Sequence, residues 1–124
     1  FQQMCNKYKG RATFYSILPG TYYTKKEVKE FQEKTGLETM IIYDEDWSWC
    51  RALDASVTPE FFLIDKKKVV YSGKMDDWAA LIGLKRRTAT EFYLKDALEN
   101  ILNNEKVALK RTEPVGCILE YGNE

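Results

Sequence analysis

The chain has 124 residues, 44% of them hydrophobic and 14% aromatic, and this length and composition fit one globular domain with its own core. Lysine and arginine together number 19, as do aspartate and glutamate, so the net charge is zero. This balance gives no excess of positive charge that would favour binding to nucleic acid or anionic lipid. No apolar run approaches the ~18 residues of a membrane span.

Histidine is absent, which excludes Ser-His and Cys-His catalysis within the chain and every histidine-ligated metal site. The three cysteines, Cys5, Cys50 and Cys117, are far apart, and no C-x-x-C pair occurs. The sequence therefore encodes neither a zinc ribbon nor a local redox pair. The odd number also leaves at least one thiol without a partner in the chain.

The first predicted element is a helix that occupies the first nine residues. The spacing i, i+3, i+4, i+7 places four side chains on one face: Phe1, Met4, Cys5 and Tyr8. Gly10 stands where a C-terminal cap belongs, and no N-cap precedes Phe1. We therefore expect this helix to be already running at residue 1, with Cys5 as a packed, structural side chain.

Two strands with a helix between them are predicted next. "ATFYSIL", Ala12–Leu18, and "ETMIIY", Glu38–Tyr43, are rich in β-branched and aromatic residues and favour strands. Between them, Thr24 and Glu27 form a capping box that opens a helix. Val28 and Phe31 are predicted to give that helix its inner face, and Gly36 to end it. The predicted order along this part of the chain is strand, helix, strand.

The next predicted elements are a short helix and a hairpin. Residues 44–46 offer N-caps for a helix in which Trp47, Cys50 and Leu53 share a face, again a packed position for the thiol. "EFFLID", residues 60–65, and "KVVYSG", residues 68–73, are two strands joined by a lysine turn.

The last predicted helix opens at Thr90 and carries an apolar stripe that includes Leu94, Ala97 and Leu98. Before it, Asp76 and Asp77 could form a pair of carboxylates for acid-base work, or a solvated loop or helix cap. The segment from residue 76 to residue 90 is too long for a simple turn and could fold over one end of the sheet as a lid.

The resulting order is α-β-α-β-α-β-β-α. Strands separated by helices favour parallel pairing through right-handed crossovers, and the late hairpin adds an antiparallel edge. We therefore expect one domain, residues 1–124, built as an α/β three-layer sandwich with a mixed sheet at its centre and helices on both faces.

This order of elements, with the motifs "VTPEFFLID", "KVVYSG" and "EPVGCIL", resembles the thioredoxin superfamily. The helix-strand unit from Thr24 to Tyr43 is similar to the insertion of its AhpC/TSA-redoxin and TlpA-like branch. The stretches "KMDD" and "RRTATEFYLKDAL" resemble one bacterial group of these proteins. The resemblance covers nearly the whole chain and rests on the order of motifs that are individually short.

The resemblance implies a redoxin-type thiol-disulfide oxidoreductase or a peroxiredoxin-like domain. Its substrate would be a protein disulfide or a peroxide and its electron partner a thiol reductant, with no metal or organic cofactor. A location in the bacterial cell envelope or periplasm is favoured.

In the family, the redox cysteine lies at the start of the helix that corresponds to the predicted helix at Phe1. This sequence begins within that helix, and the strand that precedes the helix in the family is missing. We therefore expect an N-terminally incomplete domain whose nucleophilic cysteine lies upstream, and a chain that is inactive as given. The alternative is a thioredoxin-fold binding module that has lost catalysis.

Pro59 and Cys117 are the remaining positions of interest. An X-Pro bond is cis in only about one case in twenty, so the residues alone predict a trans Pro59 that starts a strand. The resemblance instead implies a cis Thr58–Pro59 bond and a substrate-binding role for Thr58 and Pro59. Cys117 follows a glycine in a polar tail, so we expect it to be more accessible than Cys5 or Cys50, and it is the residual catalytic candidate within the chain.

Overall fold

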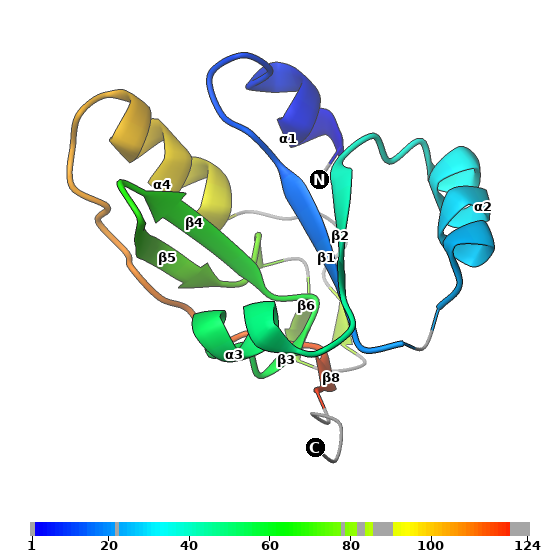
Figure 1. The fold of residues 1–124 in the computed structure, drawn as a ribbon. Helices are drawn as coiled ribbons and strands as arrows, with labels where there is room; N and C mark the ends of the chain where they lie inside the picture. Colours follow the sequence, from blue (N-terminus) through cyan, green and yellow to red (C-terminus); the bar gives the residue numbers. More distant parts are fainter. Residues whose placement is uncertain (1, 22, 78, 82–83, 86–90, 120–124) are drawn as a thin grey trace. The chain divides into compact units, whose positions relative to one another are not determined.

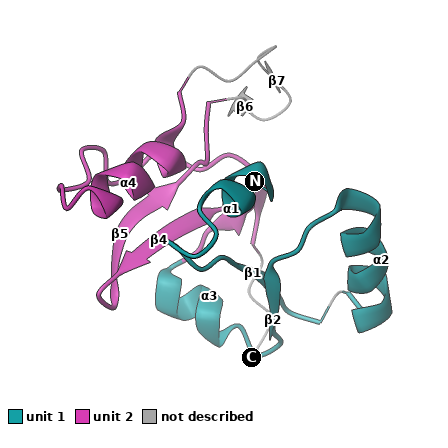
Figure 2. Cartoon of the chain, turned by 90° about the horizontal axis from the view of Figure 1, so that it is seen from above, with its two compact units in different colours: residues 1–54, 121–124 teal, residues 55–120 magenta. Residues whose placement is uncertain are grey.

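The computed structural model describes residues 2–21, 23–77, 79–81, 84–85 and 91–119 of the chain. These residues form a mixed α/β structure of helices and small sheets (Figure 1). The chain divides into two compact units, and the boundary between them follows Asp54 (Figure 2). In the described part of the chain, every helix falls short of the length and apolarity needed to cross a membrane.

The first unit contains three helices and two strands: α1 (Gln2–Lys7), β1 (Tyr15–Pro19), α2 (Lys25–Thr35), β2 (Met40–Asp44) and α3 (Ser48–Leu53). Strands β1 and β2 pair in parallel, from Tyr15 opposite Met40 to Pro19 opposite Asp44. The chain passes through α2 between them, so the predicted strand-helix-strand unit with parallel pairing is confirmed.

Helix α1 is shorter than the sequence predicts, since it ends at Lys7. The carbonyl of Tyr8 accepts the N–H groups of Arg11 and Ala12, at 2.9 and 3.1 Å, and Gly10 lies within this turn at φ +84°. The Tyr8 side chain is fully buried and Cys5 is half-buried, which agrees with the predicted apolar face.

Helix α2 confirms its predicted caps. The Thr24 hydroxyl accepts the Glu27 N–H and the Glu27 carboxylate accepts the Thr24 N–H, both at 3.1 Å. Gly36 adopts the left-handed conformation at φ +74° and ends the helix. Val28 is buried, but Phe31 is 57% exposed, so the predicted inner face holds for only one of its two members.

The second unit contains most of the strands and one helix: β3 (Val57–Thr58), β4 (Phe61–Asp65), β5 (Lys68–Gly73), β6 (Ala79–Leu81), β7 (Leu84–Lys85), α4 (Tyr93–Leu102) and β8 (Cys117–Ile118). Strands β4 and β5 form the predicted antiparallel hairpin, and β6 pairs with β7. The predicted helix start at Thr90 lies outside the described residues, and α4 begins at Tyr93.

Helix α4 packs on the β4–β5 hairpin, as Figure 1 shows. Leu94, Ala97 and Leu98 are each at most 5% exposed, which confirms the predicted apolar face of this helix. Beyond the helix, the chain returns beside β5. The Ser72 N–H donates to the Lys110 carbonyl at 3.0 Å and the Thr112 N–H to the Ser72 carbonyl at 3.1 Å, a parallel arrangement.

The fully buried Tyr71 fixes this returning segment. Its hydroxyl donates to the Lys74 carbonyl at 2.5 Å and shares a hydrogen bond with the Thr112 hydroxyl at 2.7 Å. The Thr112 hydroxyl also accepts the Lys74 N–H at 2.8 Å. Burial raises the pKa of Tyr71, so the phenol stays protonated and keeps donating at neutral pH. The chain that leads to the C-terminal tail is therefore anchored to β5.

The turn between β4 and β5 gives a first testable prediction. Lys66 and Lys67 form a two-residue loop at φ +51° and +67°, a conformation that favours glycine or asparagine. We expect Lys67→Gly to stabilise the protein by about 0.5–1 kcal/mol, because glycine relieves the positive-φ penalty but adds freedom to the unfolded chain. Urea unfolding measures the change. Lys67→Ala is the matched control: it removes the same charge and keeps the Cβ, so an equal gain there would contradict the backbone explanation.

Candidate functional site

The first feature of the site is the junction between β3 and β4. Strand β3 ends at Thr58, the Thr58–Pro59 peptide bond is cis, and β4 begins at Phe61. The cis bond confirms the expectation drawn from the family resemblance against the trans bond that the residues alone predict.

The side chain of Glu60 braces this junction. Its Oε1 atom accepts the Ser56 N–H at 2.8 Å, the Ser56 hydroxyl at 3.2 Å and the Val57 N–H at 3.3 Å. A carboxylate beyond Pro59 therefore reaches back over the turn and holds the start of β3. The sequence analysis missed Glu60, because an acidic residue at the start of a strand has no distinctive pattern.

The C-terminal tail pairs with β3. Strands β3 and β8 are antiparallel, with Val57 opposite Ile118 and Thr58 opposite Cys117 (Figure 1). The Leu119 N–H extends the pairing with a 2.9 Å hydrogen bond to the Ser56 carbonyl. The structure thus brings together two residues that the sequence singled out separately, Thr58 and Cys117.

Gly116 allows the tail to approach this closely. A Cβ atom at this position would collide with the Thr58 carbonyl group, at 2.8 Å from its carbon, and would lie 3.2 Å from the Pro59 nitrogen. Real Cβ atoms essentially never come this close to backbone. The sequence analysis did not single out Gly116, although a glycine that precedes a strand-forming stretch can mark such a backbone approach.

The three cysteines differ in exposure, and none of them forms a disulfide. Cys5 is half-buried, and burial raises the pKa of its thiol. Cys50 is 4% exposed, and burial together with the neighbouring Asp44 carboxylate raises its pKa to about 12. Cys117 is exposed, as predicted. At neutral pH Cys5 and Cys50 therefore remain thiols, the unreactive form.

Asp44 explains both the start of α3 and the state of Cys50. The buried carboxylate accepts the N–H groups of Trp49 and Cys50, each at 2.9 Å, so it caps α3 from the end of β2. The prediction that residues 44–46 supply the cap is correct for the Asp44 side chain. The N-cap position itself, however, is occupied by Trp47, in the left-handed conformation at φ +64°. Burial opposes ionisation of Asp44, but the hydrogen bonds outweigh it, so the pKa of Asp44 is lowered.

Asp77, one of the two candidate acid-base carboxylates, is hydrogen-bonded to the backbone of Glu91. Asp77 is 6% exposed, its Oδ1 atom accepts the Glu91 N–H at 3.0 Å, and its own N–H donates to the Glu91 carbonyl at 3.1 Å. These bonds close the base of the segment between β5 and α4, which is a structural role. Much of the predicted lid, including residues 78, 82–83 and 86–90, lies outside the described residues.

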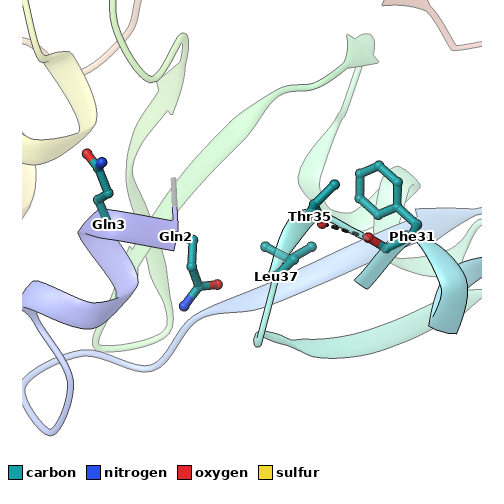
Figure 3. Close-up of a pocket in the computed structure, with 5 residues that line it drawn as sticks. All are labelled: Gln2, Gln3, Phe31, Thr35 and Leu37. Atoms are coloured by element: carbon teal, nitrogen blue, oxygen red, sulfur yellow. Dashed lines mark hydrogen bonds between the residues drawn. The ribbon is translucent and has the colours of Figure 1, made fainter. Parts of the chain in front are cut away.

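A shallow hollow of about 410 Å³ lies in the first unit, between α1 and the end of α2 (Figure 3). Its walls carry no titratable side chain: Gln2, Gln3, Phe31, Thr35 and Leu37. Within the described ranges, no three or more Cys, Asp or Glu side chains gather as a metal site. Thr58 and Cys117 therefore remain the candidate site, because they are predicted site residues that the structure places opposite each other.

The chain matches no family model and no curated protein. Crystal structures with its fold include the following two. An uncharacterized conserved protein from Geobacillus kaustophilus superimposes with a TM-score of 0.79 at 24% identity, over 98% of this chain and 67% of that one. A hypothetical protein from Sinorhizobium meliloti gives a TM-score of 0.79 at 20% identity, over 98% and 69%. The chain is thus an α/β protein with the fold of these two structures, and the likeness extends to the fold alone.

The Asp44 cap predicts a pH-dependent loss of stability. We expect Asp44→Asn to destabilise the protein by about 1–3 kcal/mol at pH 7, because the buried N–H of Cys50 and the partly buried N–H of Trp49 lose a charged acceptor. Since the folded-state pKa lies below the ordinary 3.8, the contribution is fully present above pH 3.8 and is lost as the pH falls through the folded pKa. Urea unfolding from pH 7 to pH 2 measures this. Asp46→Asn, at an exposed carboxylate that accepts one N–H from Ser48, is the control and should change stability less; an equal loss would contradict the capping role.

The exposures of the thiols predict an order of modification. We expect iodoacetamide to label Cys117 first, then Cys5 and last Cys50 in the native protein. Cys117 is the exposed thiol, and Cys50 is more buried than Cys5 and has the more strongly raised pKa. Peptide mass spectrometry of timed samples measures the three rates, and denatured protein, in which all three react, is the control. Early labelling of Cys50 would show that the α3 face opens.

Proposed function

We propose that the chain is the substrate-facing part of a redoxin-type thiol-disulfide oxidoreductase or peroxiredoxin-like domain of the thioredoxin superfamily. In this proposal the α/β fold is the three-layer sandwich of that superfamily. Thr58 and Pro59 face the substrate, and the nucleophilic cysteine belongs to a segment of the protein upstream of Phe1.

The observation that carries the proposal is the strand pairing of Thr58. Its backbone edge accepts an extended segment in antiparallel register, with Cys117 opposite Thr58 and Ile118 opposite Val57. An extended polypeptide therefore fits against the backbone edge of Thr58, which is where we propose that a peptide substrate binds.

The state of the thiols supports an external nucleophile. Thiol-disulfide exchange needs an accessible thiolate, and the raised pKa values of Cys5 and Cys50 keep these residues protonated. The upstream thiolate would attack one sulfur of a substrate disulfide, forming a mixed disulfide and releasing the other sulfur as a thiolate. A thiol of an external reductant would attack the domain's sulfur in the mixed disulfide, release the reduced substrate and leave the domain's cysteine in a disulfide with the reductant. A second thiol of the reductant would then attack the reductant's sulfur in that disulfide, which oxidises the reductant to a disulfide and restores the domain's thiol.

A second function is an inactive binding module of the same fold. The specific observation in its favour is that the described cysteines include two shielded thiols and one exposed thiol, Cys117, with no second cysteine beside it in sequence to resolve a mixed disulfide. In that case the Thr58 edge would hold a partner segment without chemistry.

The proposal predicts that the 124-residue chain has no sustained turnover in an insulin-reduction assay with dithiothreitol or in a peroxide-consumption assay. The parent gene should encode a cysteine within about two helical turns before Phe1, and the longer protein should be active in one of these assays. Absence of such a cysteine would favour the binding module. Sustained turnover by the 124-residue chain that disappears in Cys117→Ser would overturn the proposal and place the active site in the tail.

A further inference from the structure

We propose that residues 116–119 form an autoinhibitory strand, which occupies the Thr58 edge and must leave before an external extended peptide can pair there. The inference rests on the proposed function, because it takes the Thr58 edge to be the peptide-binding edge. It adds a regulatory element that belongs to the chain itself.

The tail occupies the edge in the manner of a bound peptide. It is extended, it runs antiparallel to β3, and the Leu119 N–H donates to the Ser56 carbonyl at 2.9 Å. The backbone groups along one edge of a strand can pair with only one partner strand at a time. An external peptide and the tail are therefore mutually exclusive at Thr58.

The paired part of the tail is held mainly by its backbone. Both β8 side chains are exposed, and Ile118 is 79% exposed, so they contribute little burial. The chain just before is anchored: Pro114 is buried, and Thr112 is tied to Tyr71. Residues 116–119 can therefore detach from β3 while the anchor at Thr112 and the β4–β5 hairpin stay in place.

Gly116 gives selective control over this contact. Because a Cβ at residue 116 would collide with the Thr58 carbonyl group, Gly116→Ala should push the tail off β3 without altering β3 itself. The matched control is Ile118→Thr, which changes an exposed side chain in the same strand and keeps its β-propensity.

The experiment uses the full 124-residue chain and two probes. Hydrogen exchange of the Leu119 amide, followed by NMR, reports whether the tail is paired. Fluorescence anisotropy of labelled, reduced and carboxymethylated insulin B chain reports binding of an extended peptide, and a synthetic peptide of residues 113–119 carrying Cys117→Ser serves as the competitor.

We expect faster exchange at Leu119 in Gly116→Ala and a B-chain affinity about tenfold higher than in the unmodified protein, which is the gain from freeing an edge that is about 90% occupied. The tail peptide, added in large excess because it lacks the tether, should displace the B chain, and Ile118→Thr should match the unmodified protein in both readouts. If exchange is unchanged in Gly116→Ala, the bulkier Gly116→Val replaces it.

Three results would overturn the inference, and they differ in what they say of the proposed function. Faster exchange with measurable but unchanged B-chain affinity would show that peptide binding does not compete with the tail, and would leave the proposed function standing. Faster exchange with no binding of either peptide would show that the Thr58 edge is not a peptide site, and would count against that part of the proposed function as well. Unchanged exchange in Gly116→Val would show that the tail is not held by this contact.

Discussion

The close approach of Gly116 to the Thr58–Pro59 peptide is the constraint on which the rest of the site depends. The absence of a Cβ lets the tail backbone lie against the Thr58 carbonyl group, and the register of β8 follows from that contact. The register in turn sets Cys117 opposite Thr58 and Ile118 opposite Val57. Glu60 on one side of Pro59 and the Tyr71–Thr112 hydrogen bond at the root of the tail hold the two approaching segments.

The parts of the fold that could be predicted from the sequence are those with local causes. The capping box of Thr24 and Glu27 joins residues three apart, and the β4–β5 hairpin joins adjacent strands through a two-residue loop. Such interactions depend on short spacings that a sequence displays directly. The buried face of α4 follows from helical periodicity in the same way.

The features that the sequence did not predict have non-local or backbone causes. The β3–β8 pairing joins two-residue strands about 60 residues apart, too short for a hydrophobic pattern to show. Asp44 is one of the predicted N-cap residues, yet it caps α3 from the end of β2. The N-cap position itself is taken by Trp47, in a left-handed conformation that bulky residues rarely adopt. These outcomes depend on which backbone groups tertiary packing leaves to be satisfied.

The Asp44 cap also bears on where thiol chemistry can occur. The N–H groups at the start of a helix can stabilise a thiolate. In α3, however, the N–H groups of Trp49 and Cys50 already donate hydrogen bonds to the Asp44 carboxylate. That carboxylate adds a negative charge beside Cys50 and so disfavours its ionisation, in the same direction as burial. The arrangement that stabilises the helix therefore also keeps the thiol inert.

The energetics of the tail are consistent with a contact that can be exchanged. A two-residue ladder with exposed side chains forms few hydrogen bonds and buries little apolar area, and isolated pairings of this kind are only marginally stable in water. The anchor at Thr112 keeps the tail near β3, so a high effective concentration favours a pairing that would be weak between separate molecules. A partner with a longer strand, or with side chains that contact the surface around Thr58, could gain enough to displace it. The same tether would return the tail once that partner leaves.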